Sequence, residues 1–375
     1  MSISIKWDIT YKCNLNCSHC VNGNYVGHSP RETSLIDVKH IIDNILKYTS
    51  INYLQFIGGE PLIRNDFHDI ADFMKERKIY FGIITNGTML DRDMSRLLTN
   101  ECLRSIIISL DGPDAETHNT IRGEGVFEKV VSNIELFNNY RQNHNECRTT
   151  LSINFVPTAL NYQKIAEMIR FCDTRRVTNL SILEFFDDGN AKGKNMGVPD
   201  DKAIDFLLDT ARTLNDGYPH INVVPGFIHP LALDYLHQCH GLNFPPVAHL
   251  CGAGVNFAFL DNAGKIYPCN RNRDHETVTT SNSLLEKEFR DIWINDDYNE
   301  PFSNYMNPKS YSELEPCNKC RHLFHACLPC YLSLRHKRDT MFKECWRYID
   351  AAEKMGVKLL NDQSFESLQN RQGTR

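Results

Sequence analysis

Apolar positions in the first half of the chain follow two alternating periodicities. Six short segments rich in β-branched and aromatic residues predict strands, at 3–9, 53–57, 80–85, 105–110, 151–156 and 180–186. Between them, the segments 35–48, 67–75, 126–138 and 162–172 carry apolar residues at helical spacing. Strands that alternate with helices predict a parallel α/β fold. Six such units favour a partial (βα)6 TIM-like barrel over a closed barrel of eight strands.

The alternation of strand-like and helix-like segments becomes less regular in the second half of the chain. Helical spacing returns at 199–214, and a stretch with Pro and Gly follows at 217–246. We therefore expect the barrel to occupy residues 1–215 and a linker to occupy 216–248. A cysteine-rich domain is expected at 249–350, with a C-terminal helix or tail at 351–375.

Composition narrows the classes of partner and the compartment. The 375 residues carry a formal net charge of −6 and no basic block, so nothing indicates a nucleic acid or an anionic membrane as partner. No apolar run approaches the length of a membrane span, and a strand is predicted almost at once, so we expect a cytoplasmic protein. In that reducing compartment, clustered cysteines are better interpreted as metal ligands than as disulfides.

Three cysteines follow the first predicted strand with the spacing Cys-x3-Cys-x2-Cys, namely Cys13, Cys17 and Cys20. Three thiolates on one short loop can hold three corners of a cubane iron–sulfur cluster and leave the fourth iron open to a cofactor or substrate. A zinc site is the alternative. Such sites usually combine two Cys-x2-Cys pairs into four ligands, and no second pair lies nearby in the sequence.

Four further motifs follow later predicted strands. They are Gly58-Gly59-Glu60-Pro61, Thr85-Asn86-Gly87, Ser109-Leu110-Asp111-Gly112 and Ile121-Arg122-Gly123. Together with the cysteine loop they resemble the radical SAM superfamily, whose members bind S-adenosyl-L-methionine (SAM) at such a cluster. Because the carboxyl ends of parallel strands share one edge, we expect these motifs to converge at one mouth of the barrel.

The resemblance implies a role for each motif. An open iron would chelate the methionyl group of SAM, and one electron would then release a 5′-deoxyadenosyl radical. Gly59 and Glu60 would contact the methionyl amine, and Ser109 and Arg122 the carboxylate; Arg122 could instead be a surface residue that caps the following helix. His19 stands where the family usually places an aromatic residue against the adenine, or it merely lies over the cluster loop. The implied cofactor contacts are Gly58, Gly59, Glu60, Pro61, Asn86, Ser109, Arg122 and His19.

The C-terminal cysteines resemble the seven-cysteine SPASM domain of peptide-modifying radical SAM enzymes. Cys251 is followed by Gly264 and Cys269, then by Cys317-x2-Cys320-x6-Cys327-x2-Cys330 and a lone Cys345. That pattern commonly has x5 then x3 where this chain has x6 then x2. Residues 257–268, with Asp261-Asn262-Ala263-Gly264 at their centre, predict a hairpin that brings Cys269 back beside Cys251.

The SPASM resemblance implies two auxiliary [4Fe–4S] clusters, three clusters in all. The first would be held by Cys251, Cys269 and Cys330, and the second by Cys317, Cys320, Cys327 and Cys345. The first set is one ligand short, so either an iron is open to substrate or a residue such as Cys239 completes it. A pair of zinc ribbons is the alternative that the Cys-x2-Cys spacings permit.

The function that these resemblances imply is maturation of a ribosomally synthesised peptide. A hydrogen atom is abstracted from the precursor peptide and a carbon–carbon (cyclophane) or thioether cross-link forms; flavodoxin or ferredoxin would supply electrons. The barrel is predicted to begin at residue 3, so leader recognition falls to a separate protein or to the barrel and SPASM surfaces. No catalytic residue is identified; candidates are Asp187, Asp188 and Asn270.

Three alternatives remain from the sequence. The layout is similar to anaerobic sulfatase-maturing enzymes, which form formylglycine, but Asn270 stands where they carry an Asp base, and an amide cannot accept that proton. A small-molecule dehydrogenase or epimerase would need no leader peptide. A non-enzymatic iron–sulfur or zinc-binding module would not cleave SAM.

Metal analysis after anaerobic reconstitution tests the cluster assignment. We expect about twelve irons per chain, and 5′-deoxyadenosine by mass spectrometry once SAM and dithionite are added. The variant Cys13→Ala/Cys17→Ala/Cys20→Ala should abolish the deoxyadenosine. Zinc in place of iron, or no deoxyadenosine from the loaded protein, would contradict the assignment.

Overall fold

Among the residues that the structure describes, a nine-stranded sheet has the order β7-β6-β5-β4-β3-β2-β1-β8-β9. The computed structural model describes residues 2–28, 32–91, 94–218, 220–226, 228–244, 251–273, 282–293, 311, 314–328 and 340–360. Cys330 and residues 361–375 of the expected tail lie outside these ranges.

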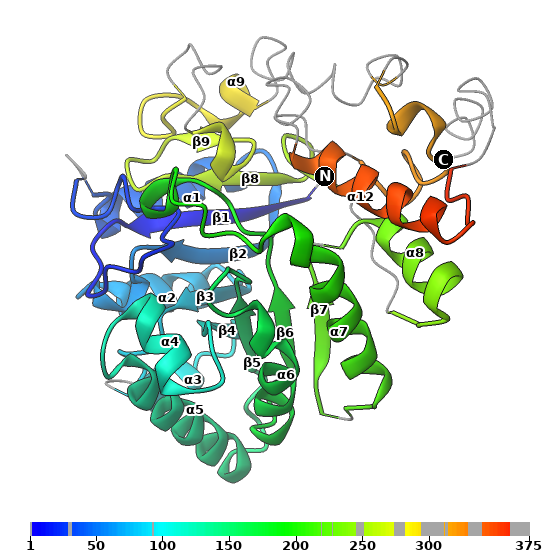
Figure 1. The fold of residues 1–375 in the computed structure, drawn as a ribbon. Helices are drawn as coiled ribbons and strands as arrows, with labels where there is room; N and C mark the ends of the chain where they lie inside the picture. The colour runs from blue at the N-terminus through cyan, green and yellow to red at the C-terminus, as the bar shows by residue number, and fades with distance from the viewer. Residues whose placement is uncertain are drawn as a thin grey trace.

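The first six strands confirm the predicted strands, with small differences at the ends. They are β1 (Ser2–Thr10), β2 (Ser50–Gly58), β3 (Phe81–Thr85), β4 (Leu103–Ser109), β5 (Thr150–Phe155) and β6 (Asn179–Ile182). Each pairs in parallel with the next, and the sheet ends at β7 and β9 without closing on itself. The partial α/β barrel is therefore confirmed (Figure 1).

Helices connect successive strands and pack on the outer face of the curved sheet (Figure 1). They are α1 (Leu35–Leu46), α2 (Phe67–Glu76), α3 (Met94–Leu98), α4 (Ala115–Arg122), α5 (Val126–Asn143), α6 (Ile165–Thr174) and α7 (Ala203–Asn215). The start of α1 shows why the sequence folds this way locally. Ser34 and Asp37 exchange hydrogen bonds in a capping box, and the apolar residues Val38, Ile41 and Ile42 then face the core.

The strands have one apolar face and one polar face. On β1, Ile3, Ile5, Trp7 and Ile9 belong to the main core, and the alternate residues Ser4, Lys6, Asp8 and Thr10 lie on the opposite face. The opposite face is the inner, concave side of the barrel. Polar side chains on that side are therefore available to the site rather than to the core.

The structure places regular elements within residues 216–248, where the sequence predicted a linker. Strand β7 (Asn222–Pro225) pairs with β6, and α8 (Pro230–His240) follows it. The strand has only four residues and the helix begins at a proline, so both resemble loop sequence when considered alone. Strand β6 shows the opposite difference, because it is shorter than predicted: it ends at Ile182, four residues before the predicted end at residue 186.

The predicted hairpin at residues 257–268 is present. Strands β8 (Phe257–Leu260) and β9 (Ile266–Tyr267) pair antiparallel, and Cys269 follows directly. The sequence did not indicate that β8 also pairs in parallel with β1, from Ser4 to Trp7. The cysteine-rich region therefore begins as part of the barrel sheet, with the indole of Trp7 donating a hydrogen bond to the carbonyl of Asp261 at 3.0 Å.

A second core lies beside the barrel. Helix α12 (Thr340–Lys354) packs against α8 (Figure 1). Tyr348 and Ile349 of α12 share this core with Tyr235 and Leu236 of α8. Helix α9 (Phe289–Trp293) contacts α1 instead. Among the described residues, no helix has both the length and the apolar character needed to cross a membrane.

A buried amide joins the barrel to the segment before α9, and its removal is a test of this fold. Asn44 on α1 donates to the carbonyls of Leu284 and Lys287 at 3.1 and 2.9 Å and accepts from the amide of Phe289 at 2.9 Å. Asn44→Ala leaves those groups unpaired, so we expect the free energy of unfolding to fall by about 2–4 kcal/mol in denaturant titrations. Asn143→Ala, at an exposed position at the end of α5, should change it by less than about 0.5 kcal/mol. Equal effects would contradict this role for Asn44.

Candidate functional site

The three N-terminal cysteines lie together on the loop after β1. Burial, followed by the charges of Cys17 and Cys13, raises the pKa of Cys20 to about 11, which places the three thiols within electrostatic reach of one another. Burial also raises the pKa of Cys13 and of Cys17. Thiols that are neutral in the free protein release protons when metal binds. The donor set fits an iron–sulfur cluster, which cysteine thiolates normally hold.

The glycines of the Gly58-Gly59-Glu60-Pro61 motif clamp the start of this loop. The amides of Gly59 and Glu60 donate to the carbonyls of Thr10 and Lys12, both at 2.8 Å, and so extend the pairing of β1 with β2. A Cβ atom on Gly58, whose φ is +133°, would lie 2.1 Å from the carbonyl oxygen of Thr10; one on Gly59 would lie 2.2 Å from that of Lys12. Only glycine allows this close approach.

Glu60 holds the motif against the end of β3. One carboxylate oxygen accepts from the amide of Leu62 at 3.1 Å and the hydroxyl of Thr85 at 2.9 Å, and the other accepts from the amide of Asn86 at 2.7 Å. Burial raises the pKa of Glu60 to about 7 despite these donors. The sequence implied that this carboxylate contacts the SAM amine together with Gly59. It already accepts from three protein donors, and a carboxylate has about four acceptor positions, so that contact stays a prediction.

Asn86 also contacts the cysteine loop. Its side-chain nitrogen lies 4.0 Å from the sulfur of Cys13 and donates to Asn14 at 2.9 Å. The two implied cofactor motifs after β2 and β3 and the loop after β1 therefore meet, as expected for the carboxyl ends of neighbouring parallel strands.

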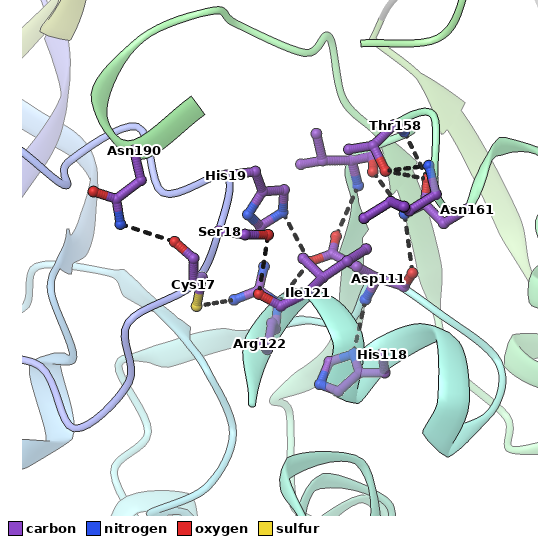
Figure 2. A network of polar contacts seen from close by, with 12 residues as sticks. Cys17, Ser18, His19, Asp111, His118, Ile121, Arg122, Thr158, Asn161 and Asn190 are labelled. Carbon is purple, nitrogen blue, oxygen red and sulfur yellow. Dashed lines mark hydrogen bonds and ion pairs between the residues drawn. The ribbon is translucent and has the colours of Figure 1, made fainter. Parts of the chain in front are cut away.

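Arg122 and His19 meet at a carboxylate that the sequence analysis did not select (Figure 2). The guanidinium of Arg122 donates to Asp111 Oδ2 at 2.6 Å and lies 3.7 Å from the sulfur of Cys17. His19 Nε2 lies 2.9 Å from the same oxygen. The Arg122 side chain is only 10% exposed, so the surface interpretation of this residue is wrong. The His19 ring therefore lies against a buried carboxylate and not merely over the loop.

Asp111 is the centre of this network. Its other side-chain oxygen, Oδ1, accepts from the amide of Val156 at 3.1 Å. Its backbone carbonyl accepts from the Asn161 side chain at 3.0 Å, and its backbone amide donates to His118 Nδ1 at 3.0 Å. Burial alone would raise the pKa of Asp111, but Arg122 and then His19 outweigh it and hold the pKa well below its usual range. Burial, together with Arg122, lowers the pKa of His118 to about 4, so this ring stays neutral and can accept the hydrogen bond.

The sequence contained a pattern that could have identified Asp111 as a site residue. It is the acid of Ser109-Leu110-Asp111-Gly112, immediately after a buried strand. Ser109, the implied contact of the SAM carboxylate, is the half-buried last residue of β4, opposite Asn154 of β5.

The loop after β6 packs on the cysteine loop through residues that the sequence did not identify. The backbone amide of Asn190 donates to the carbonyl of Cys20 at 2.9 Å. Its side chain donates to the carbonyl of Cys17, also at 2.9 Å (Figure 2). A Cβ on Gly189, where φ is +58°, would lie 2.2 Å from the carbonyl oxygen of Cys20. The candidates Asp187 and Asp188 begin this loop; Asp187 is exposed and accepts from the amide of Gly193 at 2.8 Å. Their catalytic role stays a prediction.

Four of the C-terminal cysteines line one cavity. Cys317, Cys320, Cys327 and Cys345, the set implied for the second auxiliary cluster, surround it together with His229, Pro230, Leu231, Pro316, His322 and Leu323. Burial, then the charge of Cys327, raises the pKa of Cys320 to about 11. Within the described ranges, no three His, Cys, Asp or Glu side chains are grouped to hold a single metal ion. The cavity brings together the four thiols that a [4Fe–4S] cluster requires.

The first auxiliary set is only partly described. Cys251 is exposed, Cys269 is half-buried, and Cys330 lies outside the described residues. Burial lowers the pKa of Lys6 on the inner face of β1, and the charges of Asp8 and then of Cys269 oppose that lowering, so the Cys269 thiol lies within electrostatic reach of Lys6. Asn270 follows as the half-buried first residue of a 3-10 turn at Asn270–Asn272. Cys239 lies on α8 and packs against the second core.

Comparisons with known proteins agree with this geometry. Residues 7–172 match the radical SAM superfamily, and residues 251–321 match the SPASM iron–sulfur cluster-binding domain. The chain is 29% identical to mycofactocin maturase MftC from Mycolicibacterium smegmatis over 336 residues, covering 87% of this chain and 76% of that protein. It is 24% identical to the AdoMet-dependent heme synthase of Methanosarcina barkeri over 300 residues, covering 78% and 82%.

One solved structure shows the same fold in a peptide complex. Streptococcus suis SuiB bound to its precursor peptide SuiA superimposes with a TM-score of 0.69 at 17% identity. The superposition covers 90% of this chain and 73% of SuiB. At that identity the likeness establishes the fold alone.

Replacement of Asp111 tests whether its charge supports the site. Asp111→Asn leaves the buried Arg122 guanidinium without its carboxylate, so we expect the free energy of unfolding of the metal-free protein to fall by about 3–5 kcal/mol. Asp69→Asn, on the surface of α2, should change it by less than about 0.5 kcal/mol. Denaturant titration of both variants makes the comparison, and similar small losses would show that the Asp111 charge is dispensable.

Proposed function

The chain belongs to the radical SAM superfamily and carries a SPASM domain, and from this premise we propose that it matures a ribosomally synthesised peptide. It is an enzyme, so the alternative of a non-enzymatic binding module is set aside. The observation that carries the proposal is the alignment with mycofactocin maturase, which spans 87% of this chain and so includes both domains.

The residues of the barrel mouth would hold the cofactors. Cys13, Cys17 and Cys20 would bind a [4Fe–4S] cluster with an open iron for SAM. When bound, this pair supplies a 5′-deoxyadenosyl radical that abstracts a hydrogen atom. Cysteines at the cavity of α8 and α12 would hold an auxiliary cluster, and Cys251, Cys269 and Cys330 another.

The surrounding residues orient the reactants. Arg122, fixed by Asp111 and 3.7 Å from the sulfur of Cys17, offers a positive charge to the SAM carboxylate beside the cluster loop. The backbone of Gly58 and Gly59 lies against that loop without side chains, so a ligand can approach it closely.

We further propose that the product is a cross-link, carbon–carbon or thioether. Such a ring closure removes two hydrogen atoms from the peptide. One is transferred to the deoxyadenosyl radical, and the other leaves as a proton and one electron, which an auxiliary cluster of the SPASM domain would accept. Formylglycine formation is less well supported, because Asn270 occupies the position after Cys269 and an amide is no base.

A tetrapyrrole substrate is the second candidate. The alignment with an AdoMet-dependent heme synthase covers 78% of this chain, at 24% identity, and favours a small-molecule substrate. It corresponds to the small-molecule alternative from the sequence analysis, and it differs from the peptide proposal in needing no leader sequence.

A direct substrate comparison tests the proposal. The reconstituted enzyme, SAM and dithionite are incubated with a synthetic peptide encoded next to this gene, and in parallel with an iron coproporphyrin. We expect tandem mass spectrometry to show a peptide product that lacks two hydrogen atoms, absent with Cys13→Ala. Conversion of the porphyrin but not the peptide would overturn the proposal.

A further inference from the structure

A single arginine joins the auxiliary cysteine segment to the N-terminal cysteine loop. Arg273 lies four residues after Cys269, at the end of the 3-10 turn. One nitrogen of its guanidinium donates to Asp8 Oδ2 and to the hydroxyl of Tyr11, both at 2.7 Å, and the other donates to Asn22 Oδ1 at 3.1 Å. The side chain is only 6% exposed and that of Asp8 only 1%.

Aromatic rings complete this cage around the guanidinium. Its central carbon lies 3.7 Å from the ring centre of Tyr25, 5.6 Å from that of Tyr11 and 5.5 Å from that of Phe259. The cage residues come from β1, from both sides of the Cys13–Cys20 loop and from β8. Arg273 therefore contacts β1, β8 and both ends of the cysteine loop.

Asn22 carries the connection from Arg273 to the cysteine loop. Its side-chain nitrogen donates to the carbonyl of Gly58 at 3.2 Å, and its backbone amide hydrogen-bonds to the thiol of Cys20. A continuous series of contacts therefore connects the turn after Cys269 with Cys20 and the glycine motif, through Arg273 and Asn22.

The buried charges make this connection rigid. Burial raises the pKa of Asp8 to about 6 although Arg273 opposes it, so the carboxylate depends on the guanidinium for its charge. The planar fork of arginine satisfies three oxygens at once, which the single ammonium of lysine cannot reproduce in the same geometry.

We propose that Arg273 is a positioning residue through which the Cys269 segment and the SAM-cluster loop stabilise each other. Metal bound at Cys269 anchors the residue from which the turn to Arg273 starts, and Arg273, through Asn22, then holds Cys20 and Gly58 in the arrangement that binds SAM. Because such linkage is reciprocal, bound SAM also strengthens retention of metal at Cys269. The inference rests on the proposed cluster at Cys269 and is independent of the substrate.

A double-mutant cycle measured by SAM binding tests this linkage. The dissociation constant of SAM is determined by anaerobic calorimetry on the reconstituted full chain, for the wild type, Cys269→Ala, Arg273→Lys and the double variant. We expect each single variant to bind SAM about tenfold more weakly and the double variant to bind no more weakly than either. That corresponds to a linkage of about 1.4 kcal/mol.

A matched control separates this linkage from a general effect of replacing arginine by lysine. Arg290→Lys makes the same replacement on the exposed surface of α9, and it should leave SAM affinity unchanged with or without Cys269. If Arg273→Lys does not fold, Tyr25→Leu takes its place in the cycle, because it removes one ring of the cage and keeps the ion pair; about a threefold effect is then expected.

Three outcomes overturn the inference, and the third of them also overturns the proposed auxiliary cluster at Cys269. Additive losses in the double variant, or unchanged SAM affinity in Arg273→Lys and in Tyr25→Leu, would make Arg273 a purely structural residue. Iron analysis of Cys269→Ala is read separately. If that variant keeps all of its iron, the auxiliary cluster assigned to Cys269 fails, and the linkage inferred from it fails with it.

Discussion

The contact of the Gly58 and Gly59 backbone with the carbonyls of Thr10 and Lys12 is the constraint on which the site depends. Two strands that end side by side continue their pairing past the sheet, and a Cβ atom at either glycine would collide with the opposite backbone. This contact fixes where the cysteine loop begins. Every later contact with that loop, from Asn86, Asn190 or Arg122, acts on a segment whose origin is already set.

Buried ion pairs hold the loop on two sides. Asp111 binds Arg122 and His19 on the side of α4, and Asp8 binds Arg273 on the side of the auxiliary segment. Burial raises the cost of each charge, so each depends on its partner, and removing one partner would leave the other uncompensated. The barrel mouth is thereby kept rigid by electrostatics where the backbone has little regular structure.

The auxiliary region is an extension of the barrel and not a separate appendage. Strand β8 pairs with β1, and Cys269 emerges beside the inner face of the sheet. The second cysteine set surrounds its own cavity, which residues 316–327 line together with the start of α8 and Cys345 of α12. The two auxiliary sets therefore differ in setting: one adjoins the inner face of the barrel, and the other adjoins the second core.

The sequence by itself determined the six barrel strands, the hairpin before Cys269 and the cysteine spacings, because periodicity and short motifs are local properties. It missed β7 and α8, whose short or proline-led segments become regular only through packing. Only the tertiary structure decided which charges pair. Asp8 and Arg273 lie 265 residues apart, and Asp111 meets His19 from another strand end. Such partners are chosen by the three-dimensional path of the chain, and no local pattern records that path.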